Sequence, residues 1–456
     1  MPELRESIDP GAGWGHALGA RRAKVLVITP HYAPDLGPSA PIVTGLCEDL
    51  AREQYKVSVV AGLPHHGRQH VWPEYSGRIL HLCSENGVLL ARSYVYARKA
   101  KLWQRALYHG SLNTLGLLNT LRLPKPDVVI AEGPVLWSGL PLLARGVLGK
   151  IPFIYVVQDI YPDIAVRLGA LSNRRMIEWF DRTEHFFYRR CAYISVLSEG
   201  LKETLRRKGV PEQKIVVIPA CVDVETVRPL SGDNKFRQAW RLQDKFVVLF
   251  TASLGIPQGL ENVVQAAHCL RHLDRIAVVF VGEGVAKPGL EAMVRELGLS
   301  NVYFFPLQPR EDVPSVFALA DVSLVSLRRE IVAESVPSKT YSIMASGRPV
   351  IATVQSGTEV ARLLENAECG LRVEPSDPEA LAAAIWRLHQ DPGLCRAMGE
   401  AGRRYVTEHC SREVATRLYR DLIDSLYPAP LRVGVNETHK AFHDVDGRIC
   451  SRSNSL

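Results

Sequence analysis

Short, nearly continuous apolar runs recur along the chain and are separated by stretches with helical periodicity. The first run, KVLVITP (Lys24–Pro30), is rich in β-branched residues and ends in a polar loop, which is typical of a strand buried on both faces of a parallel sheet. A helix is expected at about 41–53, because Ile42, Leu46 and Leu50 fall on one stripe. Repeated β-then-α units imply right-handed crossovers and a doubly wound parallel sheet.

The strand pattern occurs in two consecutive blocks. The first block continues through KVSVVAG, GVLLARS, PDVVIAEG, FIYVVQD, AYISVLS and KIVVIPA. After a polar stretch at 219–244 the pattern restarts with KFVVLFTA, followed by IAVVFVG, NVYFFP, DVSLVSL, RPVIATV and GLRVEP. We therefore expect an α/β protein with two Rossmann-like domains, 22–218 and 245–410, joined by a linker and separated by a cleft.

The two ends of the chain lack the alternating strand and helix pattern of these blocks. Residues 1–21 carry Gly and Pro without a period and have no apolar core like that of a signal peptide, so we expect a disordered leader. SREVATRLYRDLIDSLY, at 411–427, predicts a helix with Ser411 as its N-cap. Residues 428–456 have few apolar positions and form an extension without an assigned role.

Composition narrows the class of protein. Of the 456 residues, 46% are hydrophobic and 23% are charged, which permits a sizeable core and argues against disorder. The net charge of +7 is diffuse, so it suits an acidic small molecule or an anionic membrane surface rather than nucleic acid. No apolar run approaches the roughly 18–20 residues of a membrane span. The nine cysteines are scattered without a C-x-x-C pair, as expected of reduced thiols in a cytosolic protein.

Ligands of open parallel sheets bind beyond the carboxyl ends of the strands, so the loops that follow the strands are the candidate sites. The first, PHYAPDLGPSAP, offers backbone N–H groups at a helix N-terminus, although an ordinary connection has the same composition. In TASLGIPQGLENVVQAA, Gly255 and Gly259 flank a tight turn that suits a diphosphate. FVGEG begins like a dinucleotide fingerprint, but Lys287 stands at the third glycine position, and we infer no NAD.

A further loop, LRREIVAESVPSKTYSIMASGRPVIA, carries the most informative chemistry. Glu334, Ser335, Ser338 and Lys339 lead into a predicted helix. A carboxylate, small residues and an ammonium at a helix N-terminus suit a ligand that has both hydroxyls and phosphate. The alternative is a capped helix with a solvated lysine.

The succession of FVGEG, NVYFFPLQPREDVPSVFALADVSLVSL and PSKTYSIMASGRPVIAT resembles the family-4 retaining glycosyltransferases with the GT-B fold. The resemblance runs from about Lys24 to Tyr427 and is strongest over 246–375. VVQDIYPDIAVRLGAL, LSEGLKETL and VPSKTYSIMASGRPV are similar to the branch that builds bacterial surface polysaccharides, with its colanic-acid fucosyltransferase-like and N-acetylfucosamine transferase-like members. The resemblance implies two Rossmann-like domains facing each other across a cleft, with the helix at 411–427 crossing back to the first.

The same resemblance implies a hexosyltransferase-type enzyme (EC 2.4) of bacterial surface-polysaccharide biosynthesis. It would move a sugar, with retention, from a nucleotide-diphosphate sugar on the C-terminal domain to a polyprenyl-linked or saccharide acceptor on the N-terminal domain. No cofactor and no nucleic acid partner are implied. Because no D-x-D motif occurs within the region of resemblance, we expect metal-independent turnover and no metal site.

Site residues follow from the resemblance position by position. Glu334 matches the first glutamate of the family's E-x7-E motif, which approaches the donor hexose, and Asp159 follows a strand where the family presents a polar residue to the sugar. These two are the candidate catalytic residues. In the family, the other positions lie near the diphosphate, bind the base or lie along the donor loop. The expected donor-binding set is Gly37, Gly255, Gln258, Gly259, Leu307, Glu334, Ser335, Ser338, Lys339 and Ser342.

Three departures from the family pattern concern this set. The second motif glutamate is replaced by Ser342, whose hydroxyl would partly take over its contact with the ribose. The basic pair of the diphosphate turn is absent, and Pro38 follows Gly37 where many members have a second glycine. The diphosphate charge would then be met by backbone amides, by Lys339, or by Arg328 or Arg329.

Other functions remain open at this point. A GT-B sugar-nucleotide epimerase or a phosphorylase shares the fold, and Ser342 is consistent with a non-catalytic nucleotide-sugar-binding protein. A hydrolase with Asp159 and Asp163 as paired carboxylates is disfavoured, because Pro162 opposes their pairing on a helix.

A metal at His65, His66 and His70 is also disfavoured. Pro64 breaks any helix there, and along the sequence no carboxylate follows until Glu74.

Two segments combine basic residues with aromatic and aliphatic ones at helical spacing: ARKAKLWQRALYHGSLNTLGLLNTLRLPK and RRMIEWFDRTEHFFYRR. Such helices lie in membrane interfaces, or they turn an apolar stripe to the core and a basic face to water. The resemblance favours a cytoplasmic enzyme attached peripherally to the inner face of the plasma membrane, because such enzymes commonly use polyprenyl-diphosphate-linked acceptors.

Overall fold

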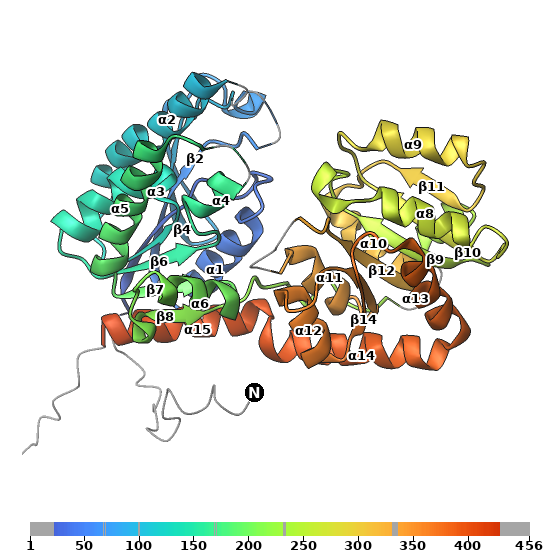
Figure 1. The fold of residues 1–456 in the computed structure, drawn as a ribbon. Helices are drawn as coiled ribbons and strands as arrows, with labels where there is room; N and C mark the ends of the chain where they lie inside the picture. The colour runs from blue at the N-terminus through green and yellow to red at the C-terminus, as the bar shows by residue number, and fades with distance from the viewer. Residues whose placement is uncertain are drawn as a thin grey trace, which may run out of the picture. The chain divides into compact units, whose positions relative to one another are not determined.

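The computed structural model of the 456-residue chain describes residues 22–66, 68, 70–98, 101–167, 169, 171–230, 234–330 and 336–428. The predicted leader at 1–21 and nearly all of the extension at 428–456 lie outside these residues. Arg22–Tyr427 forms one compact unit built on two sheets with helices on both faces (Figure 1). Among the described residues, no helix combines the length and the apolarity needed to cross a bilayer.

The first sheet has eight strands in the order β3-β4-β2-β1-β5-β6-β7-β8. All neighbouring pairs are parallel except β3 and β4, and in the centre of the sheet Val25 of β1 pairs with Val57 of β2 and Val128 of β5. The strands are β1 (Lys24–Ile28), β2 (Lys56–Gly62), β3 (Leu80–Glu85), β4 (Val88–Ser93), β5 (Val128–Glu132), β6 (Phe153–Val157), β7 (Tyr193–Val196) and β8 (Ile215–Val217).

Strand β3 is an element that the sequence analysis did not predict, and it makes the first sheet mixed rather than wholly parallel. It pairs antiparallel with β4 at the edge of the sheet, with Leu80 opposite Ser93. In its sequence, LHLCSE, Cys83 packs against the core whereas Leu82 is 45% exposed, because an edge strand has one solvated face. The turn between the strands holds Asn86 and Gly87 at φ of 49° and 80°, and this Asn-Gly pair is a hairpin signal that the sequence already contained.

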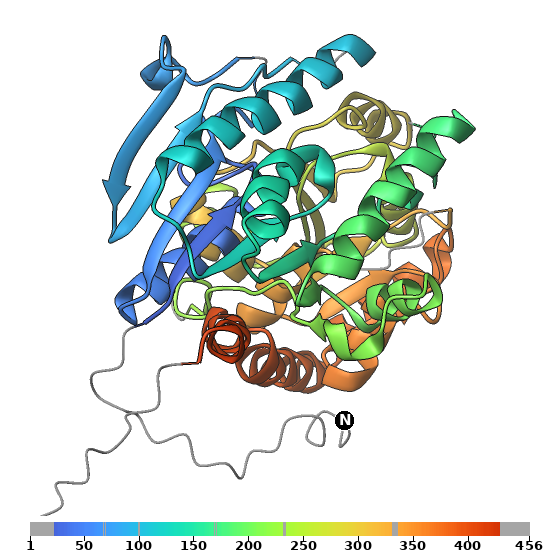
Figure 2. The same cartoon turned by 90° about the vertical axis from the view of Figure 1, so that its left-hand side faces the viewer.

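Helices cover both faces of the first sheet. On one face pack α1 (Ala40–Arg52) and the last helix of the described residues, α15 (Arg412–Leu426). Figure 2 shows the opposite face, where α2 (Leu102–Arg122), α3 (Val135–Leu142) and α5 (Arg174–Arg190) lie in front of the strands and α6 (Glu199–Arg207) lies near them. The short α4 (Asp163–Arg167) follows β6.

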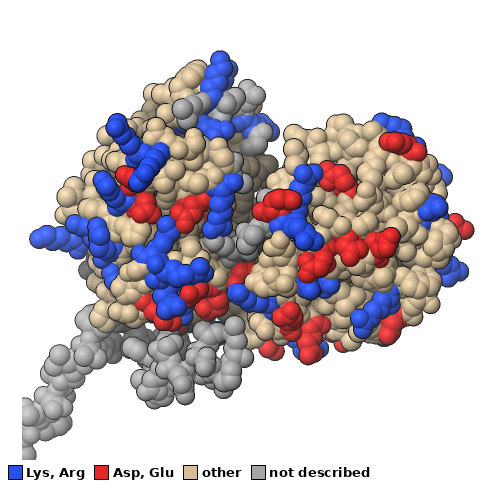
Figure 3. Space-filling view, in the orientation of Figure 1, with Lys and Arg blue, Asp and Glu red and all other residues tan. Residues whose placement is uncertain are grey.

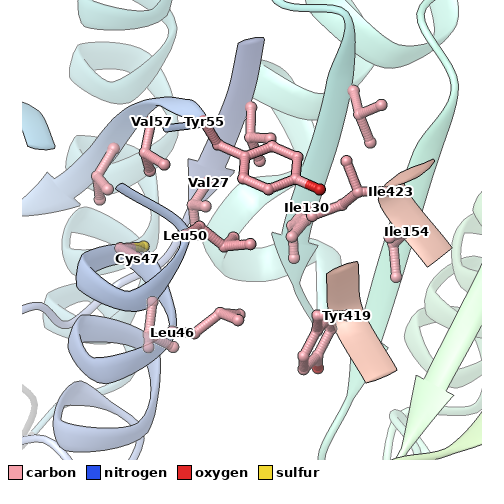
Figure 4. Close-up of a cluster of buried hydrophobic side chains, with 14 of the residues drawn as sticks. Val27, Leu46, Cys47, Leu50, Tyr55, Val57, Ile130, Ile154, Tyr419 and Ile423 are labelled. Carbon is pink, nitrogen blue, oxygen red and sulfur yellow. The ribbon is translucent and has the colours of Figure 1, made fainter. Parts of the chain in front are cut away.

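Helix α15 belongs to the core of the first sheet although it lies at the far end of the sequence. Tyr419 and Ile423 pack among Val27 and Ile130 (Figure 4). The guanidinium of Arg412 binds both carboxylate oxygens of Asp49 on α1, each at 2.7 Å. Such bidentate pairs fix orientation as well as contributing energy.

The second sheet has six parallel strands in the order β11-β10-β9-β12-β13-β14. Its strands are β9 (Phe246–Thr251), β10 (Ile276–Val281), β11 (Val302–Phe305), β12 (Val322–Ser326), β13 (Val350–Thr353) and β14 (Gly370–Val373). The surrounding helices are α7 (Lys235–Ala239), α8 (Glu261–Cys269), α9 (Lys287–Glu296), α10 (Val313–Leu319), α11 (Ser338–Ala345), α12 (Glu359–Ala367), α13 (Pro378–Gln390) and α14 (Pro392–His409).

Candidate active site

Each sheet has one point at which the strand order reverses direction. In the first sheet the chain runs outward from β1 through β2, then returns to β5 on the other side of β1. In the second sheet it runs outward from β9 and returns to β12. The loops that follow these strands diverge there, and ligands of open α/β sheets bind at such points.

In the second sheet, the loops after β9 and β12 are tied to each other. The hydroxyl of Ser326 donates to the carbonyl of Gln258 at 2.6 Å, and the amide of Arg328 donates to the carbonyl of Pro257 at 2.9 Å. Gly259 has a φ of 57°, and a Cβ at this position would lie 2.9 Å from the side chain of Arg328. Gly255 begins the turn that Gly259 ends. The turn that the sequence predicts for a diphosphate is therefore a defined structure next to β12.

Lys339 lies in the first turn of α11, and its amino group is enclosed. Among the described residues, no partner accepts a hydrogen bond from its Nζ, which lies 3.7 Å from the centre of the Phe250 ring. Burial lowers the pKa of Lys339 to about 7. Buried polar atoms are normally paired, so this amino group is a candidate to bind an anionic ligand.

Further enclosed polar atoms near these loops are unpaired within the described part of the chain. They are the side-chain oxygen Oε1 of Gln258, the hydroxyl of Thr340 and the side-chain amide of Asn262. Gln258 lies in the turn after β9, and Thr340 follows Lys339 on α11. The second sheet thus supplies both an amino group and amide or hydroxyl groups for a polar, anionic ligand.

The other cations that the sequence offered for the diphosphate are already engaged. The guanidinium of Arg328 pairs with Glu261 at 2.9 Å, and that of Arg329 donates to the carbonyl of Pro375 at 3.3 Å. Of the three cations that the sequence proposed, Lys339 is therefore the one with no described hydrogen-bond partner.

The remaining predicted donor residues vary in exposure. Ser338 is exposed at the start of α11, and Ser342 is half-buried within that helix. Leu307, after β11, is 64% exposed, so it is open to contact with a base. Glu334 and Ser335 lie outside the described residues, in the segment just before Val336.

In the first sheet, the loop after β1 brings an imidazole and a carboxylate together. Nδ1 of His31 lies 2.7 Å from Oδ2 of Asp35. Gly37 makes room for this pair, because a Cβ there would lie 2.2 Å from Cγ of His31. Burial opposes the charge of Asp35, but hydrogen bonds from His31 and from the amide of His66, together with the nearby His65, outweigh it and lower its pKa to about 2.

His65 also contacts this pair, which corrects part of the sequence analysis. The nearest carboxylate to the histidine segment is Asp35, from the preceding loop, and not Glu74: Nδ1 of His65 lies 3.6 Å from Oδ2 of Asp35. Within the described residues, His31, Asp35 and His65 are grouped closely enough to hold a metal ion. However, Nδ1 of His65 is 2.7 Å from the carbonyl of Leu63, so it carries a proton and that nitrogen is not a ligand.

A buried carboxyl lies at the end of β5, beside the loop after β1. Glu132 is 2% exposed, and burial raises its pKa, although hydrogen bonds from the Thr29 and Ser39 hydroxyls act in the opposite direction. Its Oε2 accepts from both hydroxyls, and its Oε1 accepts from the amide of Gln158 at 2.5 Å. Asp159, which the sequence analysis singled out, is the exposed neighbour of Gln158.

The sequence analysis missed His31, Asp35, Glu132 and Gln158. The available signal was their position, since each lies at or just after the carboxyl end of a predicted strand. What the sequence did not provide was the order of the strands, which places β1 between β2 and β5.

An open pocket lies next to the loop after β1. Its volume is about 500 Å³, within the range of small-ligand sites. Aromatic, basic and acidic side chains line it together, a mixture suited to stacking on and hydrogen bonding with a polar ligand. The lining residues are Pro34, Trp72, Glu74, Tyr75, Arg78, His81 and Glu85.

Two family models match most of the chain between Gly37 and Tyr405. Residues 37–221 match the family described as glycosyl transferase 4-like domain, and residues 232–405 match glycosyl transferases group 1. The chain belongs to the glycosyltransferases. It is therefore a transferase of the EC 2.4 type.

Relatives and solved structures agree with this assignment. The glycosyltransferase is 28% identical over 377 residues to the putative colanic acid biosynthesis glycosyl transferase WcaI of Escherichia coli K12, a match that covers 79% of this chain and 91% of WcaI. Sucrose-phosphate synthase from Thermosynechococcus elongatus superposes with a TM-score of 0.66 at 18% identity, over 89% of this chain and all of that one. HepE from Anabaena, solved in complex with UDP, gives 0.66 at 14% identity, over 88% of this chain and all of HepE. The expected GT-B fold is confirmed.

Proposed function

We propose that this glycosyltransferase moves a sugar from a nucleotide-diphosphate sugar to a polyprenyl-linked saccharide in the biosynthesis of a bacterial surface polysaccharide. The observation that carries the donor class is the enclosed amino group of Lys339, which lies over the Phe250 ring of β9 and has no hydrogen-bond partner among the described residues. The printed name of WcaI supports the pathway, and the UDP bound by HepE supports the nucleotide. We propose that residues 22–218 bind the acceptor and that residues 245–410 bind the donor. The helix at 411–427 crosses back to the first domain.

The reaction requires that the departing diphosphate be stabilised. A cation and the N-terminus of α11 are preorganised groups of the kind that stabilise developing negative charge. We propose that Lys339 meets the diphosphate without a metal, that Glu334 approaches the donor hexose with Asp159 as the second catalytic candidate, and that the sugar is transferred with retention. Ser342 then offers a hydroxyl to the ribose.

A thermal-shift panel followed by a transfer assay tests this function. We expect one of UDP, GDP or ADP to raise the melting temperature selectively, because a ligand of the folded state stabilises it by mass action. Its sugar form should then label a polyprenyl-diphosphate-linked saccharide, with EDTA present and with the donor's anomeric configuration retained. The residues after Tyr427 contain one D-x-D sequence, Asp444-Val445-Asp446. A protein ending at Tyr427 therefore serves as a control for metal dependence. A selective shift without transfer would instead indicate a non-catalytic nucleotide-sugar-binding protein, and no shift would contradict the donor class.

Peripheral attachment to a membrane is part of the same proposal. On α2, the side chains of Trp103, Leu107, Leu118 and Leu121 are 54%, 48%, 49% and 59% exposed, and their spacing places them on one helical face. Leu112 of the same helix is buried, so the core-facing stripe of α2 is a different one. Figure 3 shows Lys and Arg side chains gathered over the half of the molecule that contains α5. We propose that the exposed apolar face of α2, together with these basic side chains, lies on an anionic membrane of the cytoplasmic side.

Replacing Leu107 and Leu121 together by Ser is expected to weaken binding to anionic vesicles by tenfold or more, because each half-exposed leucine would lose on the order of 1 kcal/mol of burial in lipid. Flotation with phosphatidylglycerol vesicles at low salt measures the change. Trp386→Ser, at a 39% exposed position on α13, is the matched control and should float like the wild type. Failure of the wild-type protein to float would remove the membrane proposal.

A further inference from the structure

The pair formed by His31 and Asp35 lies where the strand order of the first sheet reverses. We propose that His31 accepts the proton of the attacking acceptor hydroxyl through Nε2, and that Asp35 is the positioning residue that orients its imidazole. This inference rests on the proposed function, because it concerns the acceptor half of the same reaction.

The hydrogen-bond partners determine which nitrogen of His31 is free. Asp35 is a carboxylate near neutral pH and only accepts hydrogen bonds, so Nδ1 of His31 at 2.7 Å carries the proton. The neutral imidazole then has a lone pair on Nε2, and none of the described residues hydrogen-bonds to that atom. The His31 side chain is 10% exposed, so the ring is held by the protein but is reachable from the surface.

The carboxylate that orients His31 is itself fixed by the backbone. Oδ1 of Asp35 accepts the amide hydrogens of Leu36, His65 and His66, at 2.9, 3.2 and 2.8 Å. Its Oδ2 is therefore the oxygen that faces His31. This is the arrangement by which a buried carboxylate selects one imidazole tautomer and stabilises the imidazolium when it forms.

The imidazole of His31 is also held by its neighbours. His65 stacks on it with ring centres 5.1 Å apart, and His66 contacts it edge-on at 5.2 Å. His65 is not an equivalent base, because Nδ1 donates to Leu63 and Nε2 lies 3.3 Å from the hydroxyl of Tyr108. Among the described residues, the titratable groups that face His31 are Asp35 of its own loop, His65 and His66 after β2, and Glu132 of β5, with which it interacts electrostatically.

The proposed step balances without a further reactant. The acceptor oxygen bonds to the anomeric carbon on the face from which the phosphate oxygen departs, so that configuration is retained, and the electron pair of the broken bond leaves with the nucleoside diphosphate. The hydroxyl proton passes to Nε2 of His31, and the imidazolium later releases it to water.

His31→Gln and Asp35→Asn test the inference in the intact protein. We expect His31→Gln to lower kcat/KM about 10²–10⁴-fold, the usual contribution of a general base. In Asp35→Asn, the side-chain oxygen can keep the backbone contacts of Oδ1, but an NH₂ group then faces Nδ1 of His31. The imidazole proton would move to Nε2, so this variant should lose activity to a similar extent. His70→Gln, in an exposed part of the same segment, should stay within about twofold of wild type.

Two readouts separate this role from a structural one. In both variants the thermal shift produced by the donor nucleotide should persist, and added imidazole should restore part of the activity of His31→Ala. In the wild-type protein, ¹⁵N NMR of histidine should find the proton of His31 on Nδ1. Undiminished transfer by His31→Gln, or the proton on Nε2, would overturn the inference. Absence of transfer by the wild type would overturn the proposed function instead. The NMR measurement would still show which nitrogen of His31 carries the proton.

Discussion

Lys339→Met is expected to weaken binding of the donor nucleotide by about 10- to 100-fold, corresponding to the roughly 1.5–3 kcal/mol of a hydrogen bond to a charged group. The amino group is enclosed, faces the Phe250 ring and has no described hydrogen-bond partner. An anionic diphosphate would supply that partner. Isothermal titration of the nucleotide selected by thermal shift measures the loss.

The same substitution should remove a pH dependence of binding. Because the pKa of Lys339 in the free protein is about 7, a diphosphate that prefers the ammonium form takes up a proton on binding near and above that pH. Affinity should therefore fall as the pH rises from about 7, and titrations in buffers of different ionisation enthalpy should reveal the proton uptake. Both effects should be absent in Lys339→Met.

The stability of the unliganded protein provides an internal check. The pKa of Lys339 is lowered from 10.5 to about 7 in the folded state, so between these values the unfolded chain binds the extra proton. Stability should then rise with pH across this window relative to Lys339→Met, and the variant should be at least as stable as wild type below pH 7. Lys235→Met, which breaks a contact with Asp312 on the surface, is the charge-matched control. Wild-type affinity in Lys339→Met would exclude this lysine from the donor site.

Ile423→Ala is expected to destabilise the first sheet by about 2–5 kcal/mol, the usual cost of truncating a fully buried isoleucine. Ile423 is 0% exposed and packs in the core that includes Val27 and Ile130 (Figure 4). Since α15 completes that core from the far end of the sequence, the damage should appear near the beginning of the chain. Hydrogen exchange should accelerate in β1 and β2 and stay unchanged in β9 and β10.

Arg417→Ala on the same helix is the matched control for this effect. Arg417 is exposed, so its truncation should change stability by no more than about 0.5 kcal/mol. Uniform acceleration of exchange in both sheets by Ile423→Ala would mean that the two sheets unfold together. Unchanged exchange everywhere would contradict the role of α15 in the core.

The strands of both sheets could be predicted because central strands of a parallel sheet are buried on both faces. KVLVITP and IAVVFVG are nearly continuous apolar runs for that reason, and they correspond to β1 and β10. The exception, β3, has a solvated face and therefore no continuous apolar run. Its Asn-Gly turn was a local signal, but its antiparallel direction and its place at the edge depend on β4.

In the candidate sites, too, some features could be predicted from the sequence and others depend on the tertiary structure. The sequence by itself determined the strand–loop–helix units, the glycine turn at 255–259 and the presence of Lys339 at a helix start, because these depend on residues close together in the chain. Only the tertiary structure decided that Lys339 is enclosed against Phe250 and that Asp35 contacts both His31 and His65. It likewise placed Glu132 beside Thr29. These contacts depend on which strands become neighbours, and that order is fixed by packing over the whole sheet.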